Sequence, residues 1–237
     1  MIMPMLVTLS GCYITLDDDD NFYCVNGRGA MRTETYDLTE FTKISNSVDA
    51  TLRITTGSDN HRVSVSARGN TLDEVKVRTR DGELILDTDR CIDDADVQVD
   101  IFLQELNDLF SAGSGDIIAS NTWITNEMTV NLSGSGNIEG LLEVNTLEAF
   151  ISGSGNMTLS GSSGEAQLSI AGSGNLRAFG LAMDRCNVTI AGSGNMEVLV
   201  HDELKGSISG SGRVLYKSDP GVIEVRITGS GRLVDAN

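Results

Sequence analysis

Apolar and polar residues alternate along most of the chain, and from residue 113 onward the alternation repeats with a nearly fixed period. The tripeptide Gly-Ser-Gly occurs seven times, beginning at residues 113, 134, 153, 172, 192, 210 and 229. Successive copies are therefore 21, 19, 19, 20, 18 and 19 residues apart. One copy would indicate only a loop, whereas seven copies at one period indicate a repeated unit with one coil of chain per repeat.

Alignment of the copies on their first glycine shows which positions face inward. Two inward columns precede the turn: Leu132, Ile151, Ile170, Ile190, Ile208 and Ile227 in the first, and Val130, Ala149, Leu168, Val188, Gly206 and Val225 in the second. Two more follow it: Ile117, Ile138, Met157, Leu176, Met196, Val214 and Leu233, then Ala119, Gly140, Leu159, Ala178, Val198 and Tyr216. The residues between these columns are small or polar, which predicts a strand with one buried face on each side of the turn.

Such strands can bury their apolar face only if the next coil lies on top of them. Coils stacked about 4.8 Å apart would place identical columns in contact and pair the backbone groups of neighbouring coils. We therefore predict an all-β fold in which a single domain, residues 36–237, is a parallel β-helix with about 19 residues per coil and Gly-Ser-Gly-Asn turns. Residues 56–60, Thr-Gly-Ser-Asp-Asn, are interpreted as a degenerate first copy of the turn.

The residue that follows each tripeptide forms a further column. It is an asparagine in four consecutive copies, and the whole column reads Asp116, Asn137, Asn156, Asn175, Asn195, Arg213 and Arg232. Asparagine tolerates the left-handed backbone region, and stacked asparagines predict a ladder of side-chain amides. Arg213 and Arg232 are expected to break that ladder at its C-terminal end. We interpret the column as structural, with a ligand-binding strip along it as the alternative.

The start of the chain has the composition of an export signal. Residues 1–11 carry no charge and are too few to span a bilayer as a helix, which is typical of a cleaved segment. Leu9-Ser10-Gly11-Cys12 resembles the bacterial lipobox, which implies cleavage before Cys12 and lipidation of that cysteine. Residues 12–35, with an acidic run at 17–20, then form a flexible tether to the membrane. The alternative is an N-terminal strand that contains a chance cysteine.

Charge and cysteine usage exclude several classes of function. With 34 acidic and 17 basic residues the net charge is −17, which disfavours nucleic-acid binding. The four cysteines form no C-x-x-C pair, so we expect neither a metal site nor a cofactor. Cys24 and Cys91 are candidates for a disulfide in an oxidising compartment, and Cys186 has the inward phase of a buried residue.

The order of the motifs resembles one bacterial family. Phe41-Thr42-Lys43-Ile44, the strand ending in Gly82-Glu83-Leu84-Ile85-Leu86, Leu106-Asn107-Asp108-Leu109 and the serial turns are similar to the putative auto-transporter adhesin head domains, or head GIN domains. The resemblance implies a right-handed parallel β-helix in an exported, often lipid-anchored protein. It supplies no catalytic motif.

We therefore predict a non-enzymatic lipoprotein of the cell envelope that presents a surface for adhesion or binding, with polysaccharide as the ligand. Because Tyr13 rather than an aspartate follows Cys12, the outer membrane is the expected location. Recognition is expected on the irregular side of each coil, opposite the repeated turns: residues 160–165, 181–185 and 201–205. The exposed last coil also invites strand addition and a homodimer.

Three alternatives remain open from the sequence. A polysaccharide lyase or glycosidase would need paired carboxylates with a basic partner, and the only dense candidate is Arg90 with Asp93, Asp94 and Asp96. Calcium binding by stacked turns would need an aspartate in every turn, and only Asp116 qualifies. A purely structural envelope protein is the third.

Overall fold

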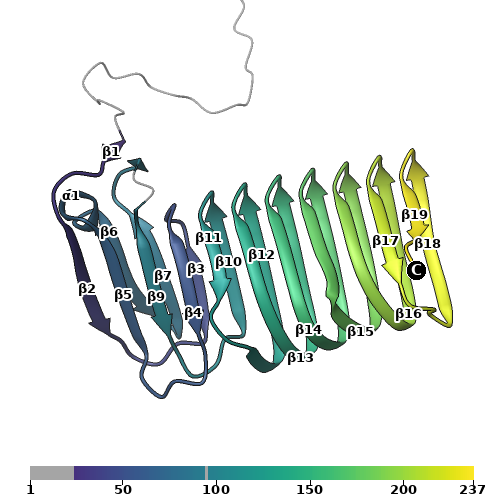
Figure 1. Cartoon of the computed structure of the whole chain (residues 1–237), viewed down its shortest axis with the longest axis horizontal. Coiled ribbons are helices and arrows are strands. Elements are labelled where there is room, and N and C mark those ends of the chain that lie inside the picture. Colours follow the sequence, from purple (N-terminus) through teal and green to yellow (C-terminus); the bar gives the residue numbers. More distant parts are fainter. Residues whose placement is uncertain (1–23, 94–95) are drawn as a thin grey trace, which may run out of the picture.

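The computed structural model describes residues 24–93 and 96–237, which form one continuous stack of β-coils (Figure 1). Its strands are β1 (Val25–Asn26), β2 (Met31–Asp37), β3 (Lys43–Asn46), β4 (Thr51–Thr55), β5 (Arg62–Arg68), β6 (Val75–Arg80), β7 (Glu83–Thr88), β8 (Ile92–Asp93), β9 (Gln98–Phe102), β10 (Asp108–Gly113), β11 (Asp116–Ala119), β12 (Trp123–Gly134), β13 (Asn137–Gly153), β14 (Asn156–Gly172), β15 (Asn175–Gly192), β16 (Asn195–Gly210), β17 (Arg213–Lys217), β18 (Val222–Gly229) and β19 (Arg232–Asp235). Within the described ranges the only helix is α1 (Gly69–Leu72), and none is long and apolar enough to cross a bilayer.

Each coil of the regular part is one long strand that curves around the core and ends at a Gly-Ser-Gly turn. β13 to β16 each run from the residue after one turn to the first glycine of the next. Neighbouring coils pair in parallel, so Gly134 lies beside Gly153, and Gly153 beside Gly172. The turns therefore line up along the upper edge of the stack in Figure 1. This arrangement confirms the predicted parallel β-helix of about 19 residues per coil.

The predicted inward columns form the core. Ile151, Ile170 and Ile190, which stand two residues before their turns, are at most 1% exposed. They belong to one hydrophobic cluster whose buried members run from Phe41 to Val214. Burying such a side chain contributes about 1.5–3 kcal/mol, so the stacked columns are the main source of stability.

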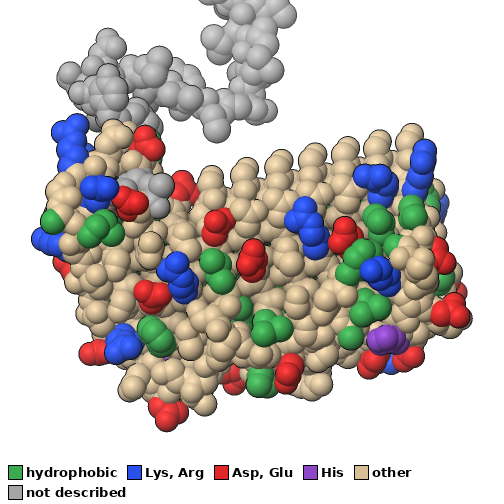
Figure 2. Space-filling model, in the orientation of Figure 1, with side chains coloured by type: hydrophobic (Ala, Val, Ile, Leu, Met, Phe, Trp, Pro, Cys, Tyr) green, Lys and Arg blue, Asp and Glu red, His purple; other side chains and the backbone are tan. Residues whose placement is uncertain are grey.

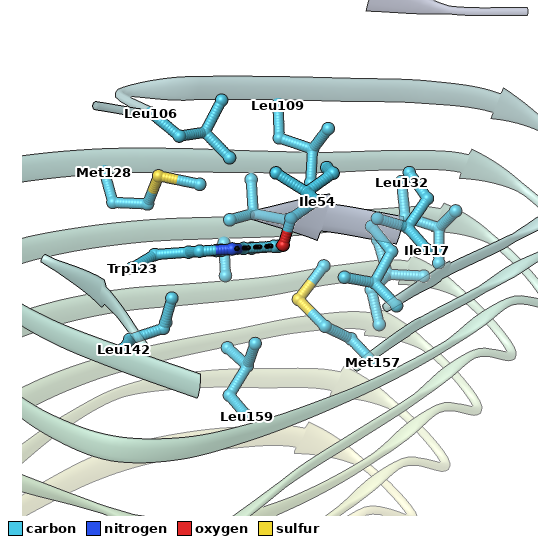
Figure 3. Packing of buried hydrophobic residues seen from close by; sticks show 14 of the residues in the cluster. Ile54, Leu106, Leu109, Ile117, Trp123, Met128, Leu132, Leu142, Met157 and Leu159 are labelled. Carbon is cyan, nitrogen blue, oxygen red and sulfur yellow. Dashed lines mark hydrogen bonds between the residues drawn. The ribbon is translucent and has the colours of Figure 1, made fainter. Parts of the chain in front are cut away.

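One coil accommodates a much larger side chain. Trp123 is fully buried, and its indole Nε1 donates a hydrogen bond to the carbonyl oxygen of Ile54 at 3.5 Å (Figure 3). Gly140 holds the inward position beside it, where a Cβ atom would lie 2.9 Å from Leu159 Cδ2 and 3.7 Å from Trp123 Cζ3. The glycine therefore leaves the space that the indole and Leu159 fill.

Antiparallel strands close the N-terminal end of the stack. β5 pairs antiparallel with β9, β2 with β5, and β6 with β7. The boundary predicted for the tether, residues 12–35, is therefore wrong, because residues 31–35 belong to β2. This strand is held by backbone pairing and by outward hydroxyls such as Thr33 and Ser66, 2.8 Å apart, so it lacks the apolar alternation that marks the other strands.

The first copy of the turn is not where the sequence placed it. Ser111 of β10 pairs with Asn46 of β3, and Ile117 of β11 with Leu52 of β4, so the coil before the first Gly-Ser-Gly turns at residues 48–50. Residues 56–60 instead join β4 to β5 on the opposite side. This turn, Val-Asp-Ala, could not be recognised in the sequence because it contains no glycine. It is joined to the next turn by the Asp49 carboxylate, which accepts a hydrogen bond from the backbone N–H of Ser114 at 2.7 Å.

Candidate functional site

The stack has two long edges with different chemistry. The turn edge consists of the seven Gly-Ser-Gly turns with the residue that follows each of them. The loop edge lies opposite, where the strands bend back between residues 140 and 147 and at the equivalent positions of other coils. All seven serines of the turn edge are exposed, and in Figure 2 the upper rim of the stack is a row of evenly spaced groups coloured tan. Side chains on the loop edge differ from coil to coil.

The asparagines of the turn edge form a continuous hydrogen-bonded ladder. The Nδ2 of Asn156 donates to Oδ1 of Asn137 at 3.0 Å, Asn175 to Asn156 at 2.9 Å, and Asn195 to Asn175 at 2.9 Å. Every bond runs in the same direction along the stack. Each amide thus uses one donor and one acceptor within the ladder, as the sequence predicted for stacked asparagines.

Charged residues close the ladder at both ends. Asn137 donates to the carboxylate of Asp116 at 2.7 Å, and the Nε of Arg213 donates to Oδ1 of Asn195 at 3.1 Å. A carboxylate can only accept and a guanidinium can only donate, so each suits the end that it occupies. The asparagine ladder thus ends where the sequence predicted a break, but Arg213 is bonded to its last asparagine rather than separate from it. Arg232, one coil further on, is exposed.

The asparagines are not needed for an unusual backbone. Among the described residues, only Asp81 and Ser218 have a positive φ without being glycine. The first glycine of each turn carries that conformation instead; φ is +129° at Gly172. The prediction that the asparagines occupy the left-handed backbone region is therefore wrong. Asparagine forms the ladder, and glycine adopts the positive φ that the turn requires.

The loop edge contains a shallow groove of about 340 Å³ that spans several coils. Its lining comes from four consecutive coils: Thr146, Glu165, Ala166, Gln167, Arg185, Cys186, Asn187, Glu203 and Lys205. Glu165, Arg185 and Glu203 stand directly beside one another in the register of β14, β15 and β16. All three fall within the irregular segments that the sequence marked for recognition.

The charges of the groove are paired with one another. Arg185 forms an ion pair with Glu165, and Lys205 with Glu203. The hydrogen bond that Arg185 donates to Glu165 raises the pKa of Arg185, and the one that Lys205 donates to Glu203 raises the pKa of Lys205. With two acids and two bases the groove is locally neutral, in a chain whose net charge is −17.

Sequence reasoning missed that these four side chains meet, although the spacing held a signal. Glu165 and Arg185 are 20 residues apart and Arg185 and Glu203 are 18 apart, which are the lengths of the two intervening coils. Below them, burial raises the pKa of the Cys186 thiol to about 12. That thiol is neutral at physiological pH and forms part of the groove floor, in keeping with the predicted buried cysteine.

The cysteines near the N-terminus divide into two cases. Cys24 and Cys91 form a disulfide that ties the start of the described chain to the loop between β7 and β8. Beside it, β1 pairs with β8. Cys12, the predicted lipidation site, lies outside the described residues.

The residues considered for catalysis form ion pairs with different partners. Arg90 pairs with Glu74 at 2.5 Å, a hydrogen bond that lowers the pKa of Glu74, whereas Asp96 pairs with Arg68 at 2.8 Å. Asp93 lies in β8, and Asp94 is outside the described residues. In the part of the chain that the structure describes, no three His, Cys, Asp or Glu side chains gather as a metal site would require.

Comparison with known proteins agrees with this architecture. Residues 40–220 match the model of a family described as "Putative auto-transporter adhesin, head GIN domain". A putative adhesin from Bacteroides fragilis has a TM-score of 0.84 at 21% sequence identity, covering 88% of this chain and 98% of its own. A putative lipid binding protein from Parabacteroides distasonis has a TM-score of 0.77 at 23% identity, covering 91% and 100%.

A putative adhesin from Parabacteroides merdae is also similar, with a TM-score of 0.73 at 24% identity over 90% of this chain and 99% of its own. At such identities the likeness shows a shared fold. No curated protein matches the chain.

Proposed function

Because the chain belongs to the head GIN domain family of adhesin-like proteins, we propose that it is an envelope lipoprotein that binds a polysaccharide along its loop edge. In this proposal Cys12 carries the lipid anchor on the outer membrane, and the β-helix holds the groove away from the lipid surface. Two or more acyl chains would give a stable anchor, since each buried methylene contributes about 0.8 kcal/mol.

The groove at Glu165, Arg185, Glu203 and Lys205 is the observation that carries the proposal. Its ion pairs hold carboxylate acceptors and guanidinium or ammonium donors side by side, and Gln167 and Asn187 add amides that both donate and accept. A sugar hydroxyl is likewise both donor and acceptor. An open groove that crosses several coils suits an extended polymer better than a small molecule, which would require a more enclosed site.

Local neutrality narrows the class of ligand. Over most of its surface a chain of net charge −17 repels polyanions, whereas the groove offers two acids beside two bases. A neutral polysaccharide can therefore approach without a large electrostatic penalty. We expect binding to such a polymer to depend only weakly on salt, unlike binding governed by net charge.

The non-enzymatic reading rests on the family and on the separation of the candidate catalytic groups. Glycoside cleavage requires two carboxyl groups that flank the scissile bond. In this chain the carboxylate of Asp96 pairs with Arg68, and Arg90, the expected basic partner, pairs with Glu74 instead. Conversion of a bound polymer into smaller products would reverse this part of the proposal and direct attention to Arg90 and its acidic neighbours.

The test is binding of the soluble chain from residue 24 onward, which contains every described strand and the disulfide, to an array of neutral and acidic polysaccharides. Arg185→Gln removes the central cation of the groove and is expected to weaken saturable binding about tenfold, the effect of one charge-assisted hydrogen bond. Arg78→Gln is the matched control, because Arg78 forms an ion pair with Asp87 on β6 and β7, away from the groove.

Product release is followed in the same samples with calcium and with a chelator. Equal loss of binding in the two variants, or no saturable binding of any polymer, would contradict the groove as the site. The anchor is tested separately by Cys12→Ser in cells, which should move the chain from the membrane fraction to the soluble fraction. Unchanged fractionation would contradict lipidation at Cys12 and leave the groove assignment standing.

A further inference from the structure

The last coil of the stack, β18 and β19, has a free edge. β18 pairs in parallel with β16 and β19 with β17, while no described strand pairs with the outer side of either (Figure 1). Side chains that would face the core in any other coil are exposed here, with Ile223 and Ile227 each 41% exposed. A strand edge with open backbone groups and apolar side chains is a template for pairing with another strand.

The sequence of β18 has an internal symmetry around Val225. Apolar Ile223 and Ile227 stand two residues to either side of it and face inward like Val225 itself, in register with the core positions of β16. Between them, acidic Glu224 and basic Arg226 occupy equivalent outward positions. Reversing the strand therefore leaves the apolar positions unchanged and exchanges the acid with the base.

We infer that β18 pairs antiparallel with β18 of a second copy of this chain, about a twofold axis through Val225. In that register Glu224 lies opposite the partner subunit's Arg226, and the symmetry repeats the pair on the other side of the axis. Ile223 lies opposite the partner subunit's Ile227, so both inward faces stay aligned. Cross-strand pairs of opposite charge and of apolar residues stabilise antiparallel sheets, whereas like charges directly opposite destabilise them.

Several features favour a second copy over other occupants. At the opposite end of the stack β2 pairs antiparallel with β5, and six of its seven residues are exposed, so it offers no apolar row that matches the last coil for head-to-tail stacking. A twofold contact uses the same patch on both subunits and closes after two copies. Arg226 forms no ion pair with any described residue. Glu224 forms one long ion pair, with Lys205 at 3.8 Å, and that lysine also pairs with Glu203, so an arginine of the partner subunit can add a second contact to Glu224.

Charge exchange tests this register. In the chain from residue 24 onward, Glu224→Arg alone and Arg226→Glu alone each place like charges opposite one another twice, and each should weaken the dimer about tenfold or more in sedimentation equilibrium. The double variant restores opposite charges and should restore the dimer. Glu148→Arg is the control, because Glu148 occupies the same outward column in the middle of the stack.

A second measurement locates the axis without relying on charge. Val225→Cys should form an intersubunit disulfide under mild oxidation, because directly opposite Cα atoms in an antiparallel pair are about 4.5–5.5 Å apart, within the Cα–Cα range of disulfides. Thr228→Cys, three residues from the axis, should crosslink far less. A wild-type chain that stays monomeric at the highest concentration reached, a double variant as weak as the single ones, or equal crosslinking at both positions would overturn the inference. A monomer that still binds polysaccharide would leave the proposed function intact.

Discussion

Ile170 and Ile227 occupy the same column of the repeat, yet they sit in different environments. Ile170, in the middle of the stack, is 1% exposed, whereas Ile227, in the last coil, is 41% exposed. Both stand two residues before a Gly-Ser-Gly turn. The difference arises because Ile170 has a coil on each side and Ile227 has a described coil on only one. In a stacked fold, a residue's contribution to stability is therefore set by its neighbouring coils.

The largest loss of stability is expected when a charge is placed in the inward column that contains Ile170. Ile170→Asp removes a buried side chain and places a carboxylate between apolar coils, which should lower the free energy of unfolding by about 3–5 kcal/mol. Denaturant unfolding followed by circular dichroism measures this change. A variant as stable as the parent chain would show that the column is not the core of the fold.

A smaller loss is expected at the turn edge of the same coil. In Gly172→Ala the new Cβ atom would lie 2.4 Å from the carbonyl oxygen of Gly153, at a φ of +129°. Backbone strain of this kind costs about 1–3 kcal/mol. Ser173→Ala, at an exposed position of the same turn, should change stability by less than about 0.5 kcal/mol and serves as the control.

Substitutions in the amide ladder should lower the stability still less, and the loss should depend on the position in the ladder. Asn175→Ala removes two hydrogen bonds in the middle of the ladder, and Arg213→Ala removes one at its end. Because a net hydrogen bond contributes about 0.5–1.5 kcal/mol and these are partly hydrated, we expect about 1 kcal/mol for the first and less for the second. Thermal unfolding of both variants distinguishes a connected ladder from isolated surface amides, for which the two losses would be equal.

The smallest effect is expected at Ile227. Ile227→Asp should lower the free energy of unfolding of the monomer by less than about 1 kcal/mol, since the new carboxylate can remain hydrated. Measurement at low protein concentration, where the chain is monomeric, separates this change in the stability of the monomer from any effect of dimer dissociation. A loss as large as that of Ile170→Asp would mean that the last coil is covered in solution even in the monomer.

The regular half of the fold was predictable from the sequence because each coil repeats the same turn and the same pattern of apolar positions. The inward columns, the parallel stacking and the asparagine ladder all follow from the spacing of the turns. The N-terminal coils lack that repetition. The turn at residues 48–50 has no glycine, and β2 has no apolar alternation because its pairing with β5 relies on backbone bonds and exposed hydroxyls.

The candidate groove was predictable only in part. Residues 160–165, 181–185 and 201–205 stood out because they vary from coil to coil. Which of their side chains meet depends on the register after each bend, and that register shifts within β14 and β15. The contact between Glu165 and Arg185 therefore could not be predicted without the register of the paired strands. The same holds for the hydrogen bond of Arg213 at the end of the ladder.

The closed ladder also makes the length of this protein adjustable in whole units. An aspartate begins it and an arginine ends it, and neither residue depends on how many asparagines stand between them. Removing residues 156–174 would bring Asn175 onto Asn137 with the same bond, and duplicating them would add one more. The reach of the molecule could thus change in steps of about 4.8 Å without redesign of either end.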